Sequence, residues 1–299
     1  MYVHLPRCYI HTYMEYPIRR VPSTECSAPV AEIPNPPQHL YIRGELPARD
    51  ARLLAVVGSR NYTNYGKQVV DHLISGLRGY PISIVSGLAL GIDTLAHVAA
   101  LDAGLHAVAV PGSGIDDSVL YPYRNRNLAG RILERGGCLL SEFEPTFEAT
   151  PWSFPKRNRI MAGLSHAVLL VEASEKSGTL ITARLTAEYN RELLVVPGNI
   201  FSENSEGVHQ FLKLGATPVT SPEDILSALH IEEGSTLEKP NIELSDEERL
   251  VFDVLKEPLD HDSIIRLLPY PKEKTLVLLM QMELGGHIKE ENGVFYRIF

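Results

Sequence analysis

Cysteine is scarce in this sequence of 299 residues: Cys8, Cys26 and Cys138 are the only ones, and no two have the CxxC spacing. An odd, unclustered set gives no complete disulfide framework and no tetrahedral zinc site, and it is typical of a reducing compartment. No apolar run approaches the ~18 residues that a membrane-spanning helix needs. Prolines and charges also interrupt residues 1–17, where a signal peptide would need an apolar core. We therefore expect a cytoplasmic protein with no membrane partner and no metal.

Positive charge is also in short supply, since the formal net charge is −9 and the pI is about 5.7. Such a chain has no overall attraction for nucleic acid, so any polyanion must be bound by a local patch. The stretch "FPKRNRIMAGLS" (residues 154–165) is the one that concentrates cations, with Lys156, Arg157 and Arg159 at the expected start of a helix. A run of this kind is usually a solvated helix face. Here Phe154 lies beside it, a combination suited to a phosphate backbone and a base together.

The chain is predicted to contain a parallel β-sheet covered by helices on both faces. Apolar runs at residues 53–58, 82–87, 106–112, 137–142, 166–173 and 192–198 alternate with helix-like segments. This pattern indicates a doubly wound, Rossmann-like α/β domain over residues 51–230. Residues 1–50, in which prolines recur, are predicted to be an irregular N-terminal arm.

The C-terminal part is predicted to be a separate small domain. Residues 231–244 are polar and are interpreted as a linker. After them, Ser245 and Glu248 form a capping-box signature, two more helical runs follow, and Asn292-Gly293 predicts a hairpin. Residues 245–299 therefore resemble a winged-helix module. They contain seven Lys/Arg and eleven Asp/Glu, a net of −4, so we expect them to contact a protein and not duplex DNA.

Two loops at predicted strand ends carry groups suited to an anion. Gly58, Ser59 and Arg60 follow the first strand of the sheet, where Gly permits close approach, Ser offers a hydroxyl and Arg supplies a bidentate fork. The loop lacks GxGxxG, so no dinucleotide cofactor is indicated. The second loop, Ser177-Gly178-Thr179, directly precedes a helix, where Ser and Thr serve as caps or as phosphate ligands.

One pair of residues could be mistaken for a metal site. Asp93 and His97 lie four residues apart on one predicted helix, but no third ligand is apparent. We interpret Asp93 as a cap at the helix start and His97 as a core histidine.

Taken together, the segments resemble the DNA-processing protein A family (DprA, also called Smf). The resemblance covers residues 33–230 and rests on an ordered set of short motifs: "IPNPPQHLYIRG", "VVGSR", "YG", "SGLALGID", "AH", "YP", "SE", "FPKRNRIMAGLS", "VEASEKSGTLITA", "VPGN" and "GA". No helical domain that could precede this core is visible in residues 1–32, so an activity requiring one is not expected. Two further cations, Arg124 and Arg126 in "YPYRNRNL", fall where the family varies.

The resemblance implies a bacterial protein that binds single-stranded DNA without enzymatic turnover or cofactor. Such a protein protects incoming strands during natural transformation, loads the RecA recombinase and works as a homodimer. The family's phosphate pocket falls on Gly58, Ser59 and Arg60, with Phe154 and the segment Lys156, Arg157, Asn158 and Arg159 nearby, and with the loop Ser177, Gly178 and Thr179 beside it. The dimer or partner surface falls on residues 206–215, where Val208, Phe211 and Leu212 share one side of a short helix, unless all three pack inward as core.

Two other functions remain open. Related Rossmann proteins are nucleotide phosphoribohydrolases, whose "PGGxGTxxE" loop corresponds here to "KSGTLITA" without the catalytic Glu; Glu142 and Glu172 are the nearby substitutes. A DNA-binding regulator acting through the winged helix is the other alternative, but its expected recognition helix offers only Lys272 and Lys274 near its start.

Overall fold

A computed structural model describes residues 16–26, 28–232, 245–255, 258–285, 287–291 and 293–297. The chain divides into two units, Met1–Leu237 and Glu238–Phe299, each with its own hydrophobic core. The border between the units falls inside the predicted linker, residues 231–244, which beyond residue 232 lies outside the described residues. Among the described helices, none is both long enough and apolar enough to cross a membrane.

The first unit is built on a nine-stranded sheet with the order β1-β2-β6-β5-β4-β3-β7-β8-β9. Its strands are β1 (Ile18–Pro22), β2 (His39–Gly44), β3 (Arg52–Val57), β4 (Ile82–Ser86), β5 (His106–Ala109), β6 (Cys138–Ser141), β7 (Ala167–Leu170), β8 (Glu192–Val195) and β9 (Thr217–Pro218). All pairings among β3 to β9 are parallel; Leu54 of β3, for example, lies opposite Ile84 on one side and Ala167 on the other. The strand order reverses at β3, so the sheet is doubly wound, as predicted.

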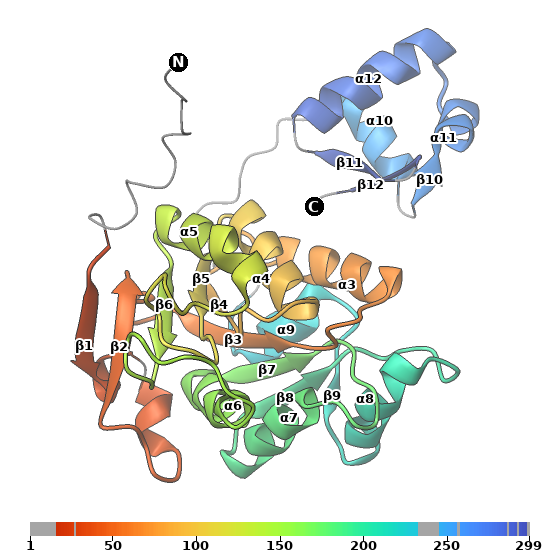
Figure 1. Cartoon of the computed structure of the whole chain (residues 1–299). Helices are drawn as coiled ribbons and strands as arrows, with labels where there is room; N and C mark the ends of the chain where they lie inside the picture. The colour runs from red at the N-terminus through yellow and green to blue at the C-terminus, as the bar shows by residue number, and fades with distance from the viewer. Residues whose placement is uncertain are drawn as a thin grey trace, which may run out of the picture. The chain divides into compact units, whose positions relative to one another are not determined.

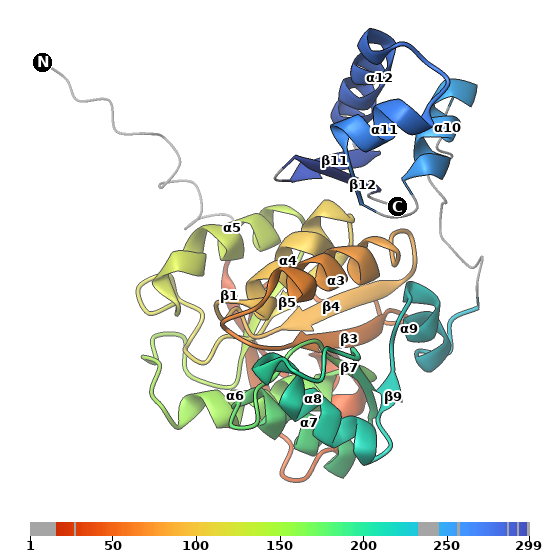
Figure 2. The same ribbon diagram turned by 90° about the vertical axis from the view of Figure 1, so that its right-hand side faces the viewer.

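Helices cover both faces of this sheet (Figures 1 and 2). One face is covered by α3 (Asn64–Ser75), α4 (Ile92–Asp102), α5 (Arg126–Glu134) and α9 (Pro222–Ala228), and the other by α6 (Ser153–Leu164), α7 (Thr179–Glu188) and α8 (Glu203–Lys213). The alternation along β3 explains the two cores: Leu54 and Val56 point into the first, while Leu53 and Val57 point into the second. Both faces of the central strands are buried, which is why they read as continuous apolar runs.

The N-terminal segment departs from the prediction for residues 1–50, which was an irregular arm. β1 pairs antiparallel with β2, and β2 pairs antiparallel with β6, so residues 18–44 extend the sheet. The short helices α2 (Ser23–Cys26) and η1 (Ala28–Glu32) connect these two strands. The described prolines of this segment lie at the ends of β1, between β1 and β2, or after β2, where no ladder N–H is needed. Residues 1–15 lie outside the described residues.

The second unit has the order of elements of a winged helix. It contains α10 (Asp246–Val254), β10 (Leu259–Asp260), α11 (His261–Leu267), α12 (Lys272–Leu284), β11 (Ile288–Glu291) and β12 (Val294–Arg297). The strands form an antiparallel sheet in the order β10-β12-β11. The predicted capping box is present, because the Ser245 hydroxyl accepts from the Glu248 N–H and the Glu248 carboxylate accepts from the Ser245 N–H. The hairpin turns at Gly293, while Asn292 lies outside the described residues.

Candidate functional site

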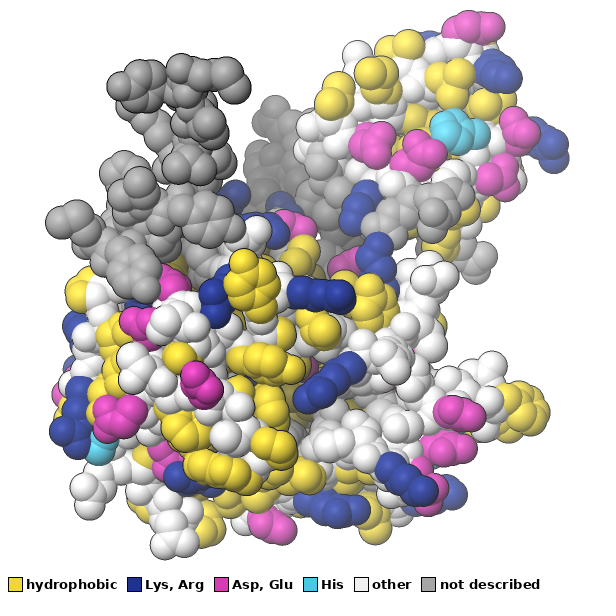
Figure 3. Space-filling view, viewed as in Figure 1, with side chains coloured by type: hydrophobic (Ala, Val, Ile, Leu, Met, Phe, Trp, Pro, Cys, Tyr) yellow, Lys and Arg dark blue, Asp and Glu magenta, His cyan; other side chains and the backbone are white. Residues whose placement is uncertain are grey.

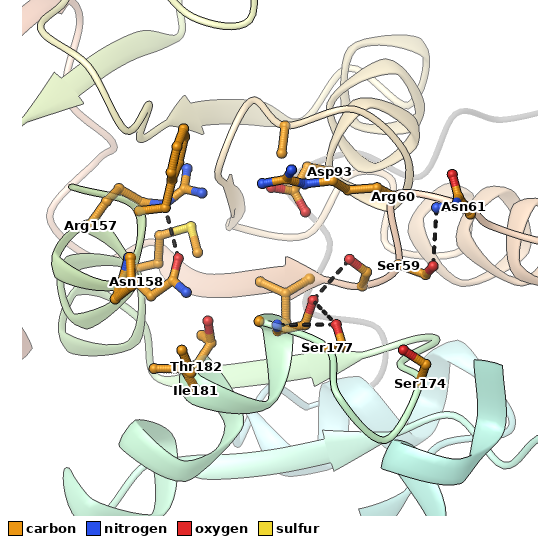
Figure 4. Close-up of a pocket in the computed structure, with 18 residues that line it drawn as sticks. Ser59, Arg60, Asn61, Asp93, Arg157, Asn158, Ser174, Ser177, Ile181 and Thr182 are labelled. Carbon is orange, nitrogen blue, oxygen red and sulfur yellow. Dashed lines mark hydrogen bonds between the residues drawn. The ribbon is translucent and has the colours of Figure 1, made fainter. Parts of the chain in front are cut away.

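A cavity of about 420 Å³ opens beside the carboxyl end of β3, where the strand order reverses. Open α/β sheets bind ligands at such a switch point, because the loops after neighbouring strands diverge there and leave helix N-termini facing the gap. The cavity brings together most of the residues predicted from the sequence (Figure 4): Gly58, Ser59, Arg60, Phe154, Arg157, Asn158, Ser177, Gly178 and Thr179.

The loop after β3 forms one wall of the cavity. Gly58 is required by a close approach, since a Cβ there would lie 2.6 Å from Ile92 Cγ1. The Ser59 hydroxyl accepts from the Asn61 N–H (3.1 Å), and the Asn204 amide of α8 donates to the Asn61 carbonyl (2.7 Å). Arg60 is exposed at the rim of this wall. The loop is therefore held in shape by side chains while its cation remains available to a ligand.

The start of α7 forms the floor and is joined to the first wall. The Ser177 hydroxyl accepts from the Thr179 N–H (3.2 Å), and the Thr179 hydroxyl donates to the Gly58 carbonyl (3.0 Å). The positive end of this ten-residue helix faces the cavity, an arrangement that favours an anion. The two loops that we identified separately in the sequence thus form one site.

The basic stretch on α6 is divided by the fold. Phe154, Arg157 and Asn158 line the cavity, with the helical spacing i, i+3, i+4 that places them on one face. Lys156 and Arg159 lie outside it and are ion-paired with Glu142, Lys156 at 3.8 Å. Lys156 and Arg159, which we predicted as phosphate-binding residues near the pocket, therefore do not line it, and their binding role stays a prediction. The reason is that Glu142, at the end of β6, lies under the other side of the helix.

Arg157 and Asp93 are two buried residues of opposite charge that line the cavity. Arg157 is only 6% exposed, and its Nη1 donates to the carbonyls of Gly87 and Val110. Burial lowers the pKa of Arg157 to about 10, an effect that Asp93 opposes. Burial likewise raises the pKa of Asp93, opposed chiefly by Arg157, and the Asp93 carboxylate accepts from the Gly87 N–H (3.0 Å). Both side chains are fixed by the ends of β4 and β5.

The sequence predicts Asp93 as a cap at the helix start and gives no sign that it lies in the site. The carboxylate does accept a backbone N–H, but from the loop before α4 rather than from the helix itself. Its place in the cavity depends on Arg157, which is far away in the sequence, so no local signal could have shown it. No group of three or more His, Cys, Asp or Glu that could hold a metal ion occurs in the part of the chain that the structure describes.

The carboxylates considered for glycosidic hydrolysis are committed to other partners. Glu172 is 3% exposed and accepts from the Thr63 N–H (2.9 Å) and the Thr63 hydroxyl at the start of α3. Glu142 pairs with the two cations of α6 described above. Neither lines the cavity, and Asp93 is the carboxylate among the lining residues.

A row of aromatic and basic side chains continues from the cavity along the surface. The Arg60 guanidinium lies 5.8 Å from the centroid of the Phe154 ring, and the Tyr121 ring lies 5.7 Å from the same ring. Tyr123 is 72% exposed, with the Arg126 guanidinium 4.6 Å from its ring centroid. Figure 3 shows apolar and basic side chains interleaved over this face of the first unit. The sequence "YPYRNR" contains both tyrosines of this row, whereas the prediction from the sequence uses only its arginines.

The surface predicted for dimer or partner contact is largely core. Val208 and Phe211 are 1% and 6% exposed, and they pack against the strands from α8. Leu212 is partly buried against the same core. The prediction is therefore wrong for Val208 and Phe211, because the face of α8 that carries them is the one turned to the sheet. The exposed apolar residue at this end of α8 is Leu214, at 79%.

The fold and site can be compared with known proteins. The family model described as DNA recombination-mediator protein A matches residues 9–230. The chain is 37% identical over 272 residues to Protein Smf of Escherichia coli, which covers 88% of this chain and 72% of that protein.

Two solved structures are similar along most of the first unit. DNA processing protein A from Streptococcus pneumoniae has a TM-score of 0.65 at 37% identity, covering 72% of this chain and 75% of that one. The protein of the same name from Helicobacter pylori has a TM-score of 0.62 at 28% identity, covering 73% and 97%, and its structure concerns a mode of single-stranded DNA binding.

Proposed function

Because the chain belongs to the DNA recombination-mediator protein A family, we propose that it binds single-stranded DNA through the cavity at the end of β3. The observation that supports this proposal is that the loop after β3, the start of α6 and the start of α7 all line the same cavity. Arg60 lies at the rim, the N-terminus of α7 forms the floor, and Phe154 offers a ring at the edge. A phosphate beside an accessible aromatic face is the unit that a single strand presents.

The cavity suits a phosphate better than a neutral ligand. Arg60 and Arg157 bring two positive charges against the single carboxylate of Asp93, and the helix N-terminus adds partial positive charge. The local balance is positive although the chain is acidic. Each phosphate neutralised on a single strand contributes about −0.7 to the slope of log affinity against log salt.

The aromatic row supports binding of more than one nucleotide. A strand whose phosphate lies at Arg60 can place successive bases on Phe154, Tyr121 and Tyr123. Stacking on such rings contributes about 1–3 kcal/mol for each base and tolerates any sequence. A stacked duplex does not offer its base faces in this way, so we expect a preference for single strands with little sequence preference.

The wider role follows from the family and not from the geometry. We propose that the protein acts in the cytoplasm, protects incoming strands in natural transformation and loads RecA onto them. We propose a homodimer through the first unit, with the surface moved from Val208 and Phe211 to Leu212, Leu214 and the edge strand β9. Leu214 is 79% exposed, and among the strands that the structure describes none pairs with the outer edge of β9.

We propose that this function involves no catalysis. The phosphoribohydrolase alternative needs a carboxylate placed beside a glycosidic bond, whereas Glu142 and Glu172 serve structural pairs and Asp93 is held by the Gly87 N–H and Arg157. Incubation with nucleoside monophosphates, followed by chromatography for released base, tests this part directly.

The binding proposal is tested by fluorescence anisotropy with labelled oligothymidylate, a duplex of equal length and free thymidine monophosphate. We expect tight binding to the single strand, weaker binding to the duplex and much weaker binding to the mononucleotide. Equal affinity for single strand and duplex, or a salt slope near zero, would contradict the proposal.

A further inference from the structure

Asn158 presents its amide to the cavity in one fixed orientation. Its Oδ1 accepts a hydrogen bond from Arg157 Nε (3.1 Å). A guanidinium has only donors, so the amide oxygen must face it and the amide nitrogen must point the other way. Figure 4 shows the nitrogen directed into the cavity. Among the described residues this nitrogen has no hydrogen-bond partner, although Asn158 is only 9% exposed.

Arg157 is itself held on several sides. Its Nη1 donates to the carbonyls of Gly87 and Val110, the residues that directly follow β4 and β5. Gly87 leaves the space for it, since a Cβ at that position would collide with Arg157 Nη1 and lie 2.5 Å from Asp93 Oδ2. A guanidinium so committed to backbone carbonyls and to a neighbouring amide has little freedom to follow a ligand.

We propose that Asn158, through its amide nitrogen, contacts the bound nucleotide, and that Arg157 is a positioning residue that fixes this amide. The inference rests on the proposed binding of single-stranded DNA and assigns different roles to Arg60, Arg157 and Asn158. Arg60 contacts the phosphate as a mobile charge at the rim. Asn158 supplies a fixed, neutral donor, which selects an oxygen acceptor such as a phosphate or base carbonyl oxygen.

This division predicts two kinds of variant. Loss of Arg60 removes a counterion-releasing contact, so Arg60→Ala should lower the magnitude of the salt slope by about 0.7. Loss of the Asn158 amide removes a neutral hydrogen bond, so Asn158→Ala should weaken binding by about tenfold or more while the slope stays that of the wild type.

The decisive experiment is a double-mutant cycle in the full chain, with anisotropy of labelled oligothymidylate as the readout. Arg157→Lys keeps the charge but removes the Nε–H that orients the amide. If Arg157 acts through Asn158, the double variant Arg157→Lys/Asn158→Ala binds as the Asn158→Ala single variant does. Additive losses would show that Arg157 contacts the DNA independently and would overturn the inference. Arg159→Lys, on the same helix but paired with Glu142, is the matched control and should bind as the wild type does.

A second measurement covers the case in which Arg157→Lys does not fold. The side-chain amide resonances of Asn158, assigned by their loss in Asn158→Ala, should shift on titration of the wild-type protein with oligothymidylate. A titration that leaves them unmoved while the oligonucleotide binds overturns the inference alone. Absence of any binding by the wild type overturns the proposed function, and this inference with it. Binding that is lost in Arg60→Ala but intact in Asn158→Ala leaves the function standing and removes only the role of Asn158.

Discussion

Replacing Arg60 by Ala should separate binding from stability. Arg60 lies exposed on the loop after β3, where its guanidinium is 5.8 Å from the centroid of the Phe154 ring. Its charge also acts on Asp93 and Arg157, with opposite signs. An exposed cation–π contact of this kind contributes about 0.5–1 kcal/mol at most. A hydrogen bond to a charged group contributes about 1.5–3 kcal/mol, so affinity for a single strand should fall by about 10–100-fold.

The matched control is Arg159→Ala, because both changes remove one arginine from the same region. Arg159 is paired with Glu142, whose side chain is 15% exposed, so its loss leaves a partly buried carboxylate without its main partner. We expect Arg159→Ala to cost about 1–2 kcal/mol of folding free energy and to leave the salt slope unchanged. Arg60→Ala should show the reverse, with an unchanged melting temperature and a slope smaller by about 0.7.

The assays are thermal melting by circular dichroism and anisotropy of labelled oligothymidylate over a series of salt concentrations. Normal binding by Arg60→Ala would mean that the cavity is not the phosphate site. An equal fall in salt slope for both variants would mean that the whole basic stretch contacts DNA, and that the division seen on α6 has no functional meaning.

Three further predictions concern acid stability, the second unit and assembly. Burial lowers the pKa of His97 from 6.5 to about 4, so between these pH values the imidazole is protonated in the unfolded chain but not in the folded one. The free energy of unfolding should therefore fall by about 3 kcal/mol as the pH is lowered from 6.5 to 4. His97→Gln should make the free energy of unfolding depend less steeply on pH in this range. An equally steep fall of unfolding free energy with pH in the variant would refute the role given to His97. The raised pKa of Asp93 makes the fold more stable at low pH, but it does so equally in the wild type and the variant. Deleting residues 235–299 should change single-strand affinity by about 1 kcal/mol or less, and a hundredfold loss in the same anisotropy assay would mean that the second unit contacts DNA. Leu214→Glu should shift sedimentation at micromolar concentration toward monomer without altering the melting temperature, and an unchanged sedimentation coefficient would place the dimer surface elsewhere.

The sheet could be predicted from the sequence because its signal is local. The strands from β3 to β8 lie in apolar runs, and burial on both faces makes those runs easy to recognise. Gly directly follows β3 and β4, and the runs that contain β5 and β8 end at Pro-Gly. β1 and β2 were missed for a physical reason as well. Pro22 ends β1 and further prolines precede β2, so the composition favours irregular structure. β2 also pairs with β6, which is far away in the chain, so no local pattern predicts that pairing.

The loops that line the site could be predicted from the sequence, but the acidic residues that pair with its cations could not. Gly58 to Arg60 and Ser177 to Thr179 were found because loops at strand ends converge in any doubly wound sheet. Which cation remains free depends on where acids from other elements lie. Glu142 and Asp93 decide this for α6; Glu142 follows β6 and Asp93 lies on α4, so the helical pattern of α6 itself shows neither of them.

The division of the basic stretch also bears on the proposal that an acidic chain binds a polyanion. Lys156 and Arg159 meet Glu142 on one side of α6, and Arg157 meets Asp93 and backbone carbonyls at the base of the cavity. Most of the cations in this stretch of the sequence are therefore engaged with groups of the protein itself. What remains for a ligand is Arg60, the end of α7 and a fixed amide. Such a site attracts a phosphate over short distances only, so its selectivity must come from geometry and stacking and not from a long-range field.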